Sequence, residues 1–278
     1  MVKPGLTSFW RSKRTILHLM SLVVILAACQ EQESGPVVVQ AFPTADTLPE
    51  NLLRMYVQFS EPMKTVGSLE KIKLIDQDGQ MVSGAIFNNV YELWDAEQKQ
   101  LTLIFDPARV KTGLITNERL GRALQSGKFY QLVIDSLESV QHRPLATSFR
   151  KGFYVCDQDT VPPDIQSWQL IPPTLGNPST LIVRFPQMVD YMSLWHRLAV
   201  VTAAGEPLPG KTKVIKGEQE WQFKVARRWE PGNYFLYVNT RLADPAGNNL
   251  NGKFDHQIGT LKFDQEGEIL KIPFQVMN

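Results

Sequence analysis

The stretch Leu53-Arg54-Met55-Tyr56-Val57-Gln58-Phe59 sets the pattern for the whole chain. Leu53, Met55, Val57 and Phe59 alternate with more polar side chains. Successive side chains of a β-strand point to opposite faces, so this period of two predicts a strand with one buried face and one solvated face. Similar alternating or short apolar segments lie at residues 72–75, 101–105, 130–134, 149–155, 181–185, 198–201, 221–225 and 234–238.

Helical periodicity is confined to one short segment, residues 117–124, where Leu120, Ala123 and Leu124 could share a face. Turn signals such as Asp76-Gln77-Asp78-Gly79 separate the strand-like segments. Many short strands joined by such turns predict an all-β protein built from sandwiches.

The second half of the chain repeats the first. Phe59 aligns with Phe185 at an offset of 126 residues, whereas Tyr130 aligns with Tyr234 at an offset of 104. The offset falls by 22 between these anchors, so we expect an insertion of about that length in the first copy, at residues 106–125. Internal repetition with one insertion indicates two copies of one module.

Two sequence signatures give this module a family resemblance. Val57-Gln58-Phe59-Ser60-Glu61-Pro62-Met63 resembles the opening strand of bacterial Ig-like domains of S-layer and other surface proteins. Those domains often close with Asp-x-x-Gly-Asn and an apolar residue, as in Asp244-Pro245-Ala246-Gly247-Asn248-Asn249-Leu250. The first copy closes instead with Ser139-Val140-Gln141-His142-Arg143-Pro144-Leu145, at an offset of 105 residues. The resemblance implies tandem Ig-like β-sandwiches and brings no catalytic residues with it.

Prolines that lack an N–H group mark the boundary between the copies at Asp159-Thr160-Val161-Pro162-Pro163-Asp164. The expected division is a lipoprotein signal peptide at 1–28, a tether at 29–37, a first Ig-like domain at 38–158, a linker at 159–164 and a second Ig-like domain at 165–278.

The N-terminal segment predicts export. Four basic and no acidic residues lie among residues 1–28, and the apolar run at 16–28 is shorter than the roughly 20 residues of a membrane span. Leu26-Ala27-Ala28-Cys29 resembles the lipobox of bacterial lipoproteins, which implies lipidation of Cys29. Gln30 follows instead of aspartate. By analogy with enterobacterial sorting, this implies anchoring in the outer membrane of a diderm host, facing the periplasm or the surface.

Composition excludes several functions. Removing residues 1–28 leaves 25 basic against 28 acidic side chains, a formal charge near −3, which does not suit a nucleic-acid partner. Once Cys29 is lipidated, Cys156 has no intrachain partner, so neither a disulfide framework nor a cysteine zinc site is expected.

Motif inspection predicts no catalytic residue, no metal ligand and no cofactor. Gly205-Glu206-Pro207-Leu208-Pro209-Gly210-Lys211-Thr212 matches a phosphate-binding loop in letters only. Pro207 and Pro209 cannot supply the backbone N–H groups that such a loop aims at phosphate, so we expect a turn and no nucleotide. The chain lacks the H-E-x-x-H and G-x-S-x-G motifs. An envelope hydrolase with carboxylates that meet only in space remains an alternative.

Two groups of residues are candidates for partner binding. The insertion is locally basic, which suits an anionic partner. Alternatively, its apolar residues could fold it down as a lid over an exposed sheet end; these are Val110, Leu114, Ile115, Leu120 and Leu124. Two tryptophans beside charged residues could stack on sugars, as in a carbohydrate-binding accessory lipoprotein, or anchor a protein partner. Edge packing against the other domain would explain them as well. These candidates are Arg109, Lys111, Arg119 and Arg122 in the insertion, and Trp195 and Trp229 in the second copy. The leading interpretation is a non-enzymatic, lipid-anchored envelope protein that interacts with a protein or glycan or serves a structural role.

Overall fold

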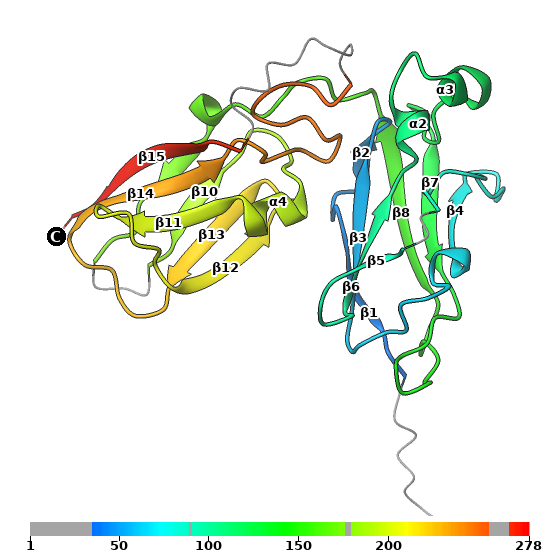
Figure 1. Ribbon diagram of the computed structural model, residues 1–278, viewed down its shortest axis with the longest axis horizontal. Helices are drawn as coiled ribbons and strands as arrows, with labels where there is room; N and C mark the ends of the chain where they lie inside the picture. The colour runs from blue at the N-terminus through cyan, green and yellow to red at the C-terminus, as the bar shows by residue number, and fades with distance from the viewer. Residues whose placement is uncertain (1–34, 89–90, 176–178, 256–266, 278) are drawn as a thin grey trace, which may run out of the picture. The chain divides into compact units, whose positions relative to one another are not determined.

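The protein is almost entirely β-structure in the computed structural model, which describes residues 35–88, 91–175, 179–255 and 267–277 (Figure 1). Its strands form two sandwiches, each of two sheets. We call the unit of β1 to β8 the first sandwich and the unit of β9 to β15 the second sandwich. The expected signal peptide and Cys29 lie outside the described residues. The described helices are too short to cross a bilayer.

The first sandwich consists of two four-stranded sheets in the orders β1-β3-β6-β5 and β2-β8-β7-β4. Neighbouring strands pair antiparallel, except for the parallel pair β2 and β8. The strands are β1 (Val38–Phe42), β2 (Thr47–Pro49), β3 (Arg54–Phe59), β4 (Ile72–Asp76), β5 (Leu93–Trp94), β6 (Gln100–Ile104), β7 (Phe129–Ile134) and β8 (Phe149–Cys156).

The second sandwich consists of sheets in the orders β12-β13-β10-β9 and β11-β14-β15, with all neighbours antiparallel. Its strands are β9 (Gln169–Ile171), β10 (Leu181–Arg184), β11 (Leu198–Thr202), β12 (Gly210–Ile215), β13 (Glu220–Val225), β14 (Gly232–Asn239) and β15 (Ile269–Val276).

The two sandwiches share one topology. The order β1-β3-β6-β5 corresponds to β9-β10-β13-β12, and β4-β7-β8 corresponds to β11-β14-β15. Among the described strands, only β2 lacks a counterpart. The all-β prediction is therefore confirmed, and the folds are Ig-like β-sandwiches. The exact domain boundaries stay a prediction; residues 159–164 lie between β8 and the short 3-10 helix η3 (Ile165–Ser167).

Each sandwich has its own apolar core, which the alternating patterns predicted. Met55, Val57 and Phe59 are buried on the face of β3 that belongs to the core of the first sandwich, whereas Leu53, just before β3, is buried near Gly247 of the second sandwich. Trp221 is buried on β13 in the core of the second sandwich. Burial of a large apolar side chain contributes roughly 1.5–3 kcal/mol to folding, so these rows hold the sheets together.

The helices differ from the sequence expectation. The segment expected at 117–124 forms the shorter α3 (Ile115–Leu120), and α2 (Pro107–Val110) and α4 (Tyr191–His196) were missed. Helices this short carry little periodic signal. The helices α2 and α4 begin at capping aspartates: Asp106 accepts a hydrogen bond from Ala108 N, and Asp190 accepts one from Ser193 N. The other described helix is η2 (Leu69–Lys71).

Candidate functional site

Three of the four basic residues predicted in the insertion have structural contacts. Arg109 is 6% exposed, and its guanidinium donates hydrogen bonds to main-chain carbonyls, including those of Gly121 and Ser83 at 2.9 Å. Arg122 forms an ion pair with Glu50 at 3.3 Å. The expectation of a free basic patch is therefore wrong for Arg109, because four carbonyls satisfy its donors in the interior.

The remaining residues of the insertion divide between core and surface. The ammonium of Lys111 lies 4.4 Å from the ring centroid of Phe254, while Arg119 is exposed. Val110 and Leu124 join the core of the first sandwich, as the lid interpretation predicted. The lid residues Leu114, Ile115 and Leu120 are exposed instead. Partner binding by Arg119 and Lys111 stays a prediction.

The two candidate tryptophans lie in different aromatic clusters. Trp229 is 6% exposed, packs against Phe223, Tyr234 and Phe274, and donates its indole N–H to Ser179 O at 2.9 Å. Its role as an exposed partner-binding residue is therefore wrong, and so is edge packing against the other domain: Trp229 belongs to the core of the second sandwich. Trp195, at the end of α4, is 43% exposed and contacts Tyr191 edge-on, so it remains available to a partner.

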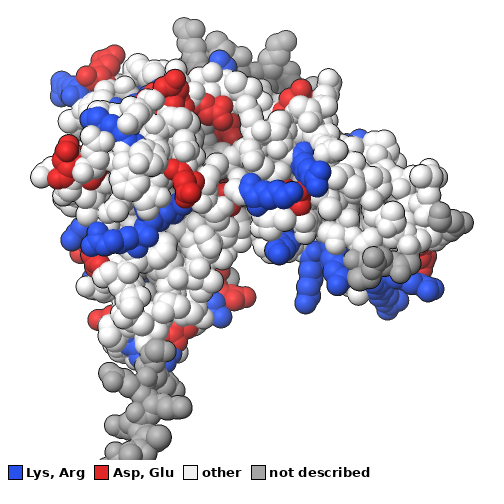
Figure 2. Space-filling view, turned by 180° about the vertical axis from the view of Figure 1, so that it is seen from behind, with Lys and Arg blue, Asp and Glu red and all other residues white. Residues whose placement is uncertain are grey.

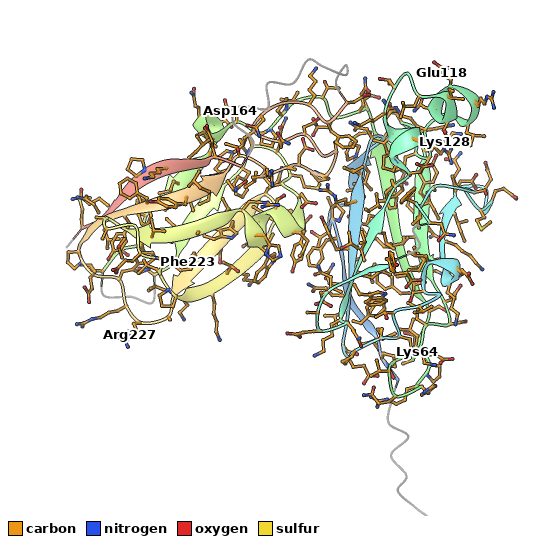
Figure 3. The ribbon with its side chains drawn as sticks, viewed as in Figure 1. Lys64, Glu118, Lys128, Asp164, Phe223 and Arg227 are labelled. Carbon is orange, nitrogen blue, oxygen red and sulfur yellow. The ribbon has the colours of Figure 1, made fainter. Side chains whose placement is uncertain are left out.

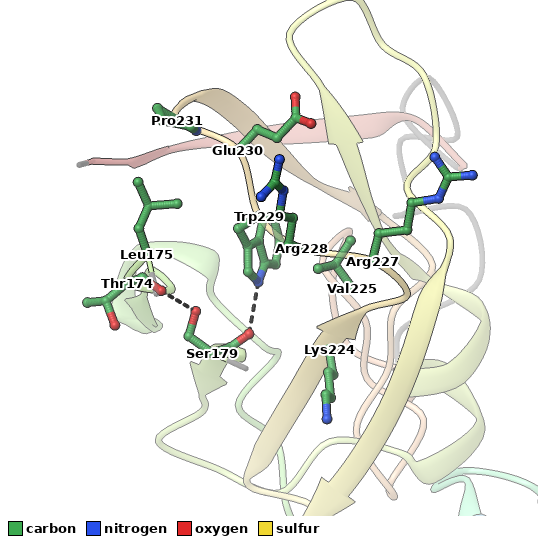
Figure 4. A pocket seen from close by; sticks show the side chains of 10 residues that line it. All are labelled: Thr174, Leu175, Ser179, Lys224, Val225, Arg227, Arg228, Trp229, Glu230 and Pro231. Atoms are coloured by element: carbon green, nitrogen blue, oxygen red, sulfur yellow. Dashed lines mark hydrogen bonds between the residues drawn. The ribbon is translucent and has the colours of Figure 1, made fainter. Parts of the chain in front are cut away.

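A groove that the sequence analysis did not find lies beside Trp229. It has a volume of about 850 Å³ and runs along the connection from β13 to β14 (Figure 4). Its lining combines cations and one carboxylate with apolar and hydroxyl groups. The charged residues are Lys224, Arg227, Arg228 and Glu230; the others are Leu175, Val225, Pro231, Trp229, Thr174 and Ser179. Phe223 points into the core, whereas Arg227 points away from the sheets (Figure 3). The only sequence signal was the pair Arg227-Arg228 beside Trp229.

The residues that match the phosphate-binding motif, 205–212, lie in a turn that leads into β12, and the turn was predicted. Gly205 N donates to Thr202 O at 2.9 Å and has φ of 86°, and residues 210–212 already belong to β12. No helix follows this stretch; β12 runs directly into the next hairpin.

Buried aromatic and polar side chains of the two sandwiches meet in one contact. Its apolar part is formed by Phe42, Tyr56 and Tyr191, with Phe42 and Tyr191 stacked at 3.6 Å between ring centroids. Tyr56 donates its hydroxyl to Asp190 Oδ2 at 2.7 Å. Burial, followed by the neighbouring charge of Asp190, raises the pKa of Tyr56 and keeps the phenol a donor.

A second buried carboxylate lies in the same contact. Glu218 is 2% exposed and accepts hydrogen bonds from both Thr44 N and Thr44 Oγ1 at 2.8 Å. Burial raises the pKa of Glu218, although the Thr44 hydrogen bonds and Lys151 oppose the shift. Burial likewise lowers the pKa of Lys151, whose ammonium donates to Thr44 O and Ala45 O.

The closing turn of the second sandwich extends this contact. Leu53 N donates to Pro245 O at 2.8 Å, and Asn248 Nδ2 donates to Asp159 O at 3.0 Å. Asp244 is buried and accepts from Asn248 N and Nδ2. Burial raises the pKa of Asp244 to about 7; its hydrogen bonds with Asn248 oppose this shift and the charge of Asp159 adds to it.

Two carboxylates and one thiol of the fold have raised pKa values. The two carboxylates with raised pKa, Glu218 and Asp244, already accept hydrogen bonds inside the fold. Burial raises the pKa of the Cys156 thiol, which disfavours the thiolate that a nucleophile needs. The described residues contain no group of three or more His, Cys, Asp or Glu placed to hold a metal ion.

The fold defines this chain as a tandem Ig-like β-sandwich protein. No protein-family model and no curated protein matches it. It is similar to CopC from Methylosinus trichosporium OB3b at 16% identity, over 45% of this chain and 98% of that one, with a TM-score of 0.31. The S-layer protein rSbsC(31-844) is 11% identical over 79% of this chain and 26% of that one, with a TM-score of 0.32. Native α2-macroglobulin from Escherichia coli, domains MG0-NIE-MG1, is 10% identical over 88% and 72%, with a TM-score of 0.28.

Proposed function

We propose that the chain is a non-enzymatic, lipid-anchored protein of the bacterial cell envelope, whose Ig-like sandwiches serve an interaction or structural role. The observation that carries the proposal is the buried contact between the sandwiches, in which Tyr56 and Thr44 of the first donate to Asp190 and Glu218 of the second. Breaking such a hydrogen bond leaves a buried polar group without a partner, at a cost of about 1–3 kcal/mol.

This contact supports a rigid scaffold in preference to two domains joined only by a flexible linker. Residues from Pro36 onward form one compact unit. Loops on a rigid β-scaffold are where recognition commonly resides, because the sheets fix their positions. The acylation signature at Leu26-Ala27-Ala28-Cys29 supports attachment of this scaffold to a membrane, and Gln30 supports the outer membrane of a diderm host.

The anchoring is tested by substituting the two cysteines separately. Cys29→Ser should release the protein from the membrane fraction and abolish incorporation of labelled fatty acid. Cys156→Ser, in β8, is the matched control and should leave both unchanged. Mass spectrometry of the purified wild-type protein should show a diacylglyceryl cysteine as the first residue.

A wild-type protein that begins at another residue, or a Cys29→Ser variant that stays with the membrane, would contradict lipid anchoring. Either outcome would leave the Ig-like fold untouched and would move the proposal toward a secreted or otherwise attached protein.

A further inference from the structure

Five exposed cations gather on one side of the second sandwich, around the groove beside Trp229. Lys and Arg side chains are visible along this edge, at the lower right of Figure 2. They come from the paired strands β12 and β13 and from the connection that follows. These residues are Lys211, Lys213, Lys224, Arg227 and Arg228.

Two of these charges face each other directly. Lys211 on β12 and Lys224 on β13 are cross-strand partners in the antiparallel register. Like charges at directly opposite positions destabilise a sheet. Within the described part of the chain, no carboxylate forms an ion pair with either lysine. Elsewhere on the same sheet the pattern is the reverse, because Glu220 pairs with both Arg184 and Lys216.

Edge protection explains only part of this arrangement. Lysines on an edge strand discourage pairing with other chains, and β12 is an edge strand. That reason covers Lys211 and Lys213. It does not cover Lys224, which lies on the interior strand β13, or Arg227 and Arg228, which lie in the connection to β14.

The shape of the site indicates what kind of anion fits. The groove volume of about 850 Å³ is within the range of sites for small ligands and short chain segments. Lys224 and Glu230 lie toward opposite ends of it, with Trp229 between them (Figure 4). A planar lipid surface contacts the rim of such a hollow, whereas a linear polymer can lie along it.

The side-chain types favour a sugar polymer over a protein. Protein interfaces are depleted in lysine but enriched in arginine and aromatic residues, so an accessible aromatic anchor is the feature that distinguishes a protein partner at this groove. Here the aromatic group that could anchor a protein, Trp229, is buried. The guanidinium groups of Arg227 and Arg228 match the geometry of carboxylates and phosphates, and the ammonium of Lys224 adds a hydrated point charge. The apolar wall of Leu175, Val225 and Pro231 can contact the less polar faces of sugar rings.

We propose that the groove between Lys224 and the Arg227-Arg228 pair binds an anionic polysaccharide of the cell envelope. Lys211 extends the positive surface along β12, and the apolar wall supports the sugar rings. This inference rests on the proposed envelope function for the source of the polymer. The binding itself is measured on the purified chain, whatever its anchor.

The test uses the purified full chain in detergent and sodium oligogalacturonate as the probe. The triple variant Lys224→Gln, Arg227→Gln, Arg228→Gln should lose about tenfold or more in affinity, since each lost cation removes a contact that releases counterions. The matched control is Lys73→Gln, Lys128→Gln, Arg150→Gln, which removes the same number of charges from exposed positions of the first sandwich. It should change affinity by less than about twofold, because exposed charges beyond a Debye length of about 10 Å are screened.

Two further measurements sharpen the result. Glu230→Gln removes the acidic group among the residues lining the groove and should strengthen binding, which no folding defect would imitate. Wild-type affinity should fall as sodium chloride rises from about 50 to about 300 mM. Thermal unfolding of both triple variants verifies that they fold.

Several outcomes would overturn the proposal. Equal losses in the two triple variants would show attraction to overall charge. Equal binding of methyl-esterified, uncharged oligogalacturonate would remove the role of the cations. Tighter binding to phosphatidylglycerol vesicles or to polyglutamate would assign the groove to a membrane or to an acidic peptide. None of these results bears on release of the Cys29→Ser variant, so the two proposals fail separately.

Discussion

The turns that close the two sandwiches have the same hydrogen bonds and very different surroundings. Ser139 N donates to Arg143 O and Asp244 N donates to Asn248 O, both at 2.9 Å. The side chain of the first residue also accepts from the backbone of the fifth, as Ser139 Oγ from Arg143 N and as Asp244 Oδ1 from Asn248 N. Yet residues 140–142 are exposed, whereas residues 244–248 are buried.

One pair of equivalent positions shows which residue types the two surroundings allow. His142 in the first turn corresponds to Gly247 in the second, with φ of 63° and 87°. The exposed first turn accepts a histidine there. In the second turn, an added Cβ at Gly247 would lie 2.7 Å from Leu53 Cδ2 of the first sandwich. The turn conformation by itself therefore tolerates a side chain, and the close approach of the other sandwich is what requires glycine.

Gly247→Ala should lower the free energy of unfolding more than any other substitution predicted for these two turns. Left-handed backbone strain and overpacking against Leu53 together should lower the free energy of unfolding by roughly 2–5 kcal/mol. His142→Ala in the first turn, which already has a non-glycine residue, should change it by less than about 0.5 kcal/mol. Urea denaturation measures both, and similar losses in the two variants would refute the assigned role of the contact.

The connections between corresponding strands provide the second comparison. In the first sandwich, the insertion between β6 and β7 places Leu124, 1% exposed, in the core. Leu124→Ala should therefore lower the free energy of unfolding by about 2–4 kcal/mol. Leu120→Ala, at 64% exposure in the same insertion, is the control and should have little effect. If Leu124→Ala is as mild as the control, the insertion is not a lid.

The third comparison concerns pH, because the first turn has Ser139 where the second has Asp244. The pKa of Asp244 is about 7 in the fold, above the ordinary value of 3.8, so the folded protein binds a proton more tightly than the unfolded chain. Stability should therefore fall as pH rises from about 5 to about 8, by roughly 2–3 kcal/mol for this group. The raised pKa of Glu218 acts in the same direction.

Asp244→Asn removes the titrating group and should flatten most of this dependence. Thermal unfolding from about pH 5 to about pH 8 measures it, over the range in which a pKa near 7 titrates. An unchanged slope in the variant would mean that other groups carry the dependence. Ser139→Ala should leave the slope as it is in the wild type.

The smallest expected effect comes from comparing a tyrosine hydroxyl in the contact between the sandwiches with one on the surface. Tyr56→Phe removes the donor to Asp190 and leaves a buried carboxylate short of one hydrogen bond, a loss of about 1–2 kcal/mol. Tyr154→Phe on β8, 60% exposed, is the matched control and should be nearly neutral. A loss in the Asp190→Asn background equal to that in the wild type would show that the Tyr56 hydroxyl does not act through Asp190.

Sequence pattern recovered the parts of the fold that depend on local periodicity. The alternation identified β3 and its core-facing side, and repeat spacing gave Arg143 and Asn248 equivalent positions in the two closing turns. The other side of β3 was expected to be solvated, but Tyr56 there is buried in the contact between the sandwiches. Sequence did not recover α4, because six residues behind the capping Asp190 carry too little periodicity. It also misjudged Trp229 and Arg109, because neighbouring charges suggested exposure whereas the fold buries both side chains.

The sequence by itself determined the two β-rich copies and the insertion in one of them, since each is written in the order of residues along the chain; lipidation at Cys29 stays a prediction from the same order. Only the tertiary structure decided that Tyr56 meets Asp190, that Gly247 lies against Leu53, and that Lys224 joins Arg227 and Arg228 around a groove. Strand alternation fixes which face of a strand is buried, but it does not fix which distant surface covers the turn or lines the hollow. Those contacts depend on how complete sheets pack, and no short stretch of sequence encodes that packing.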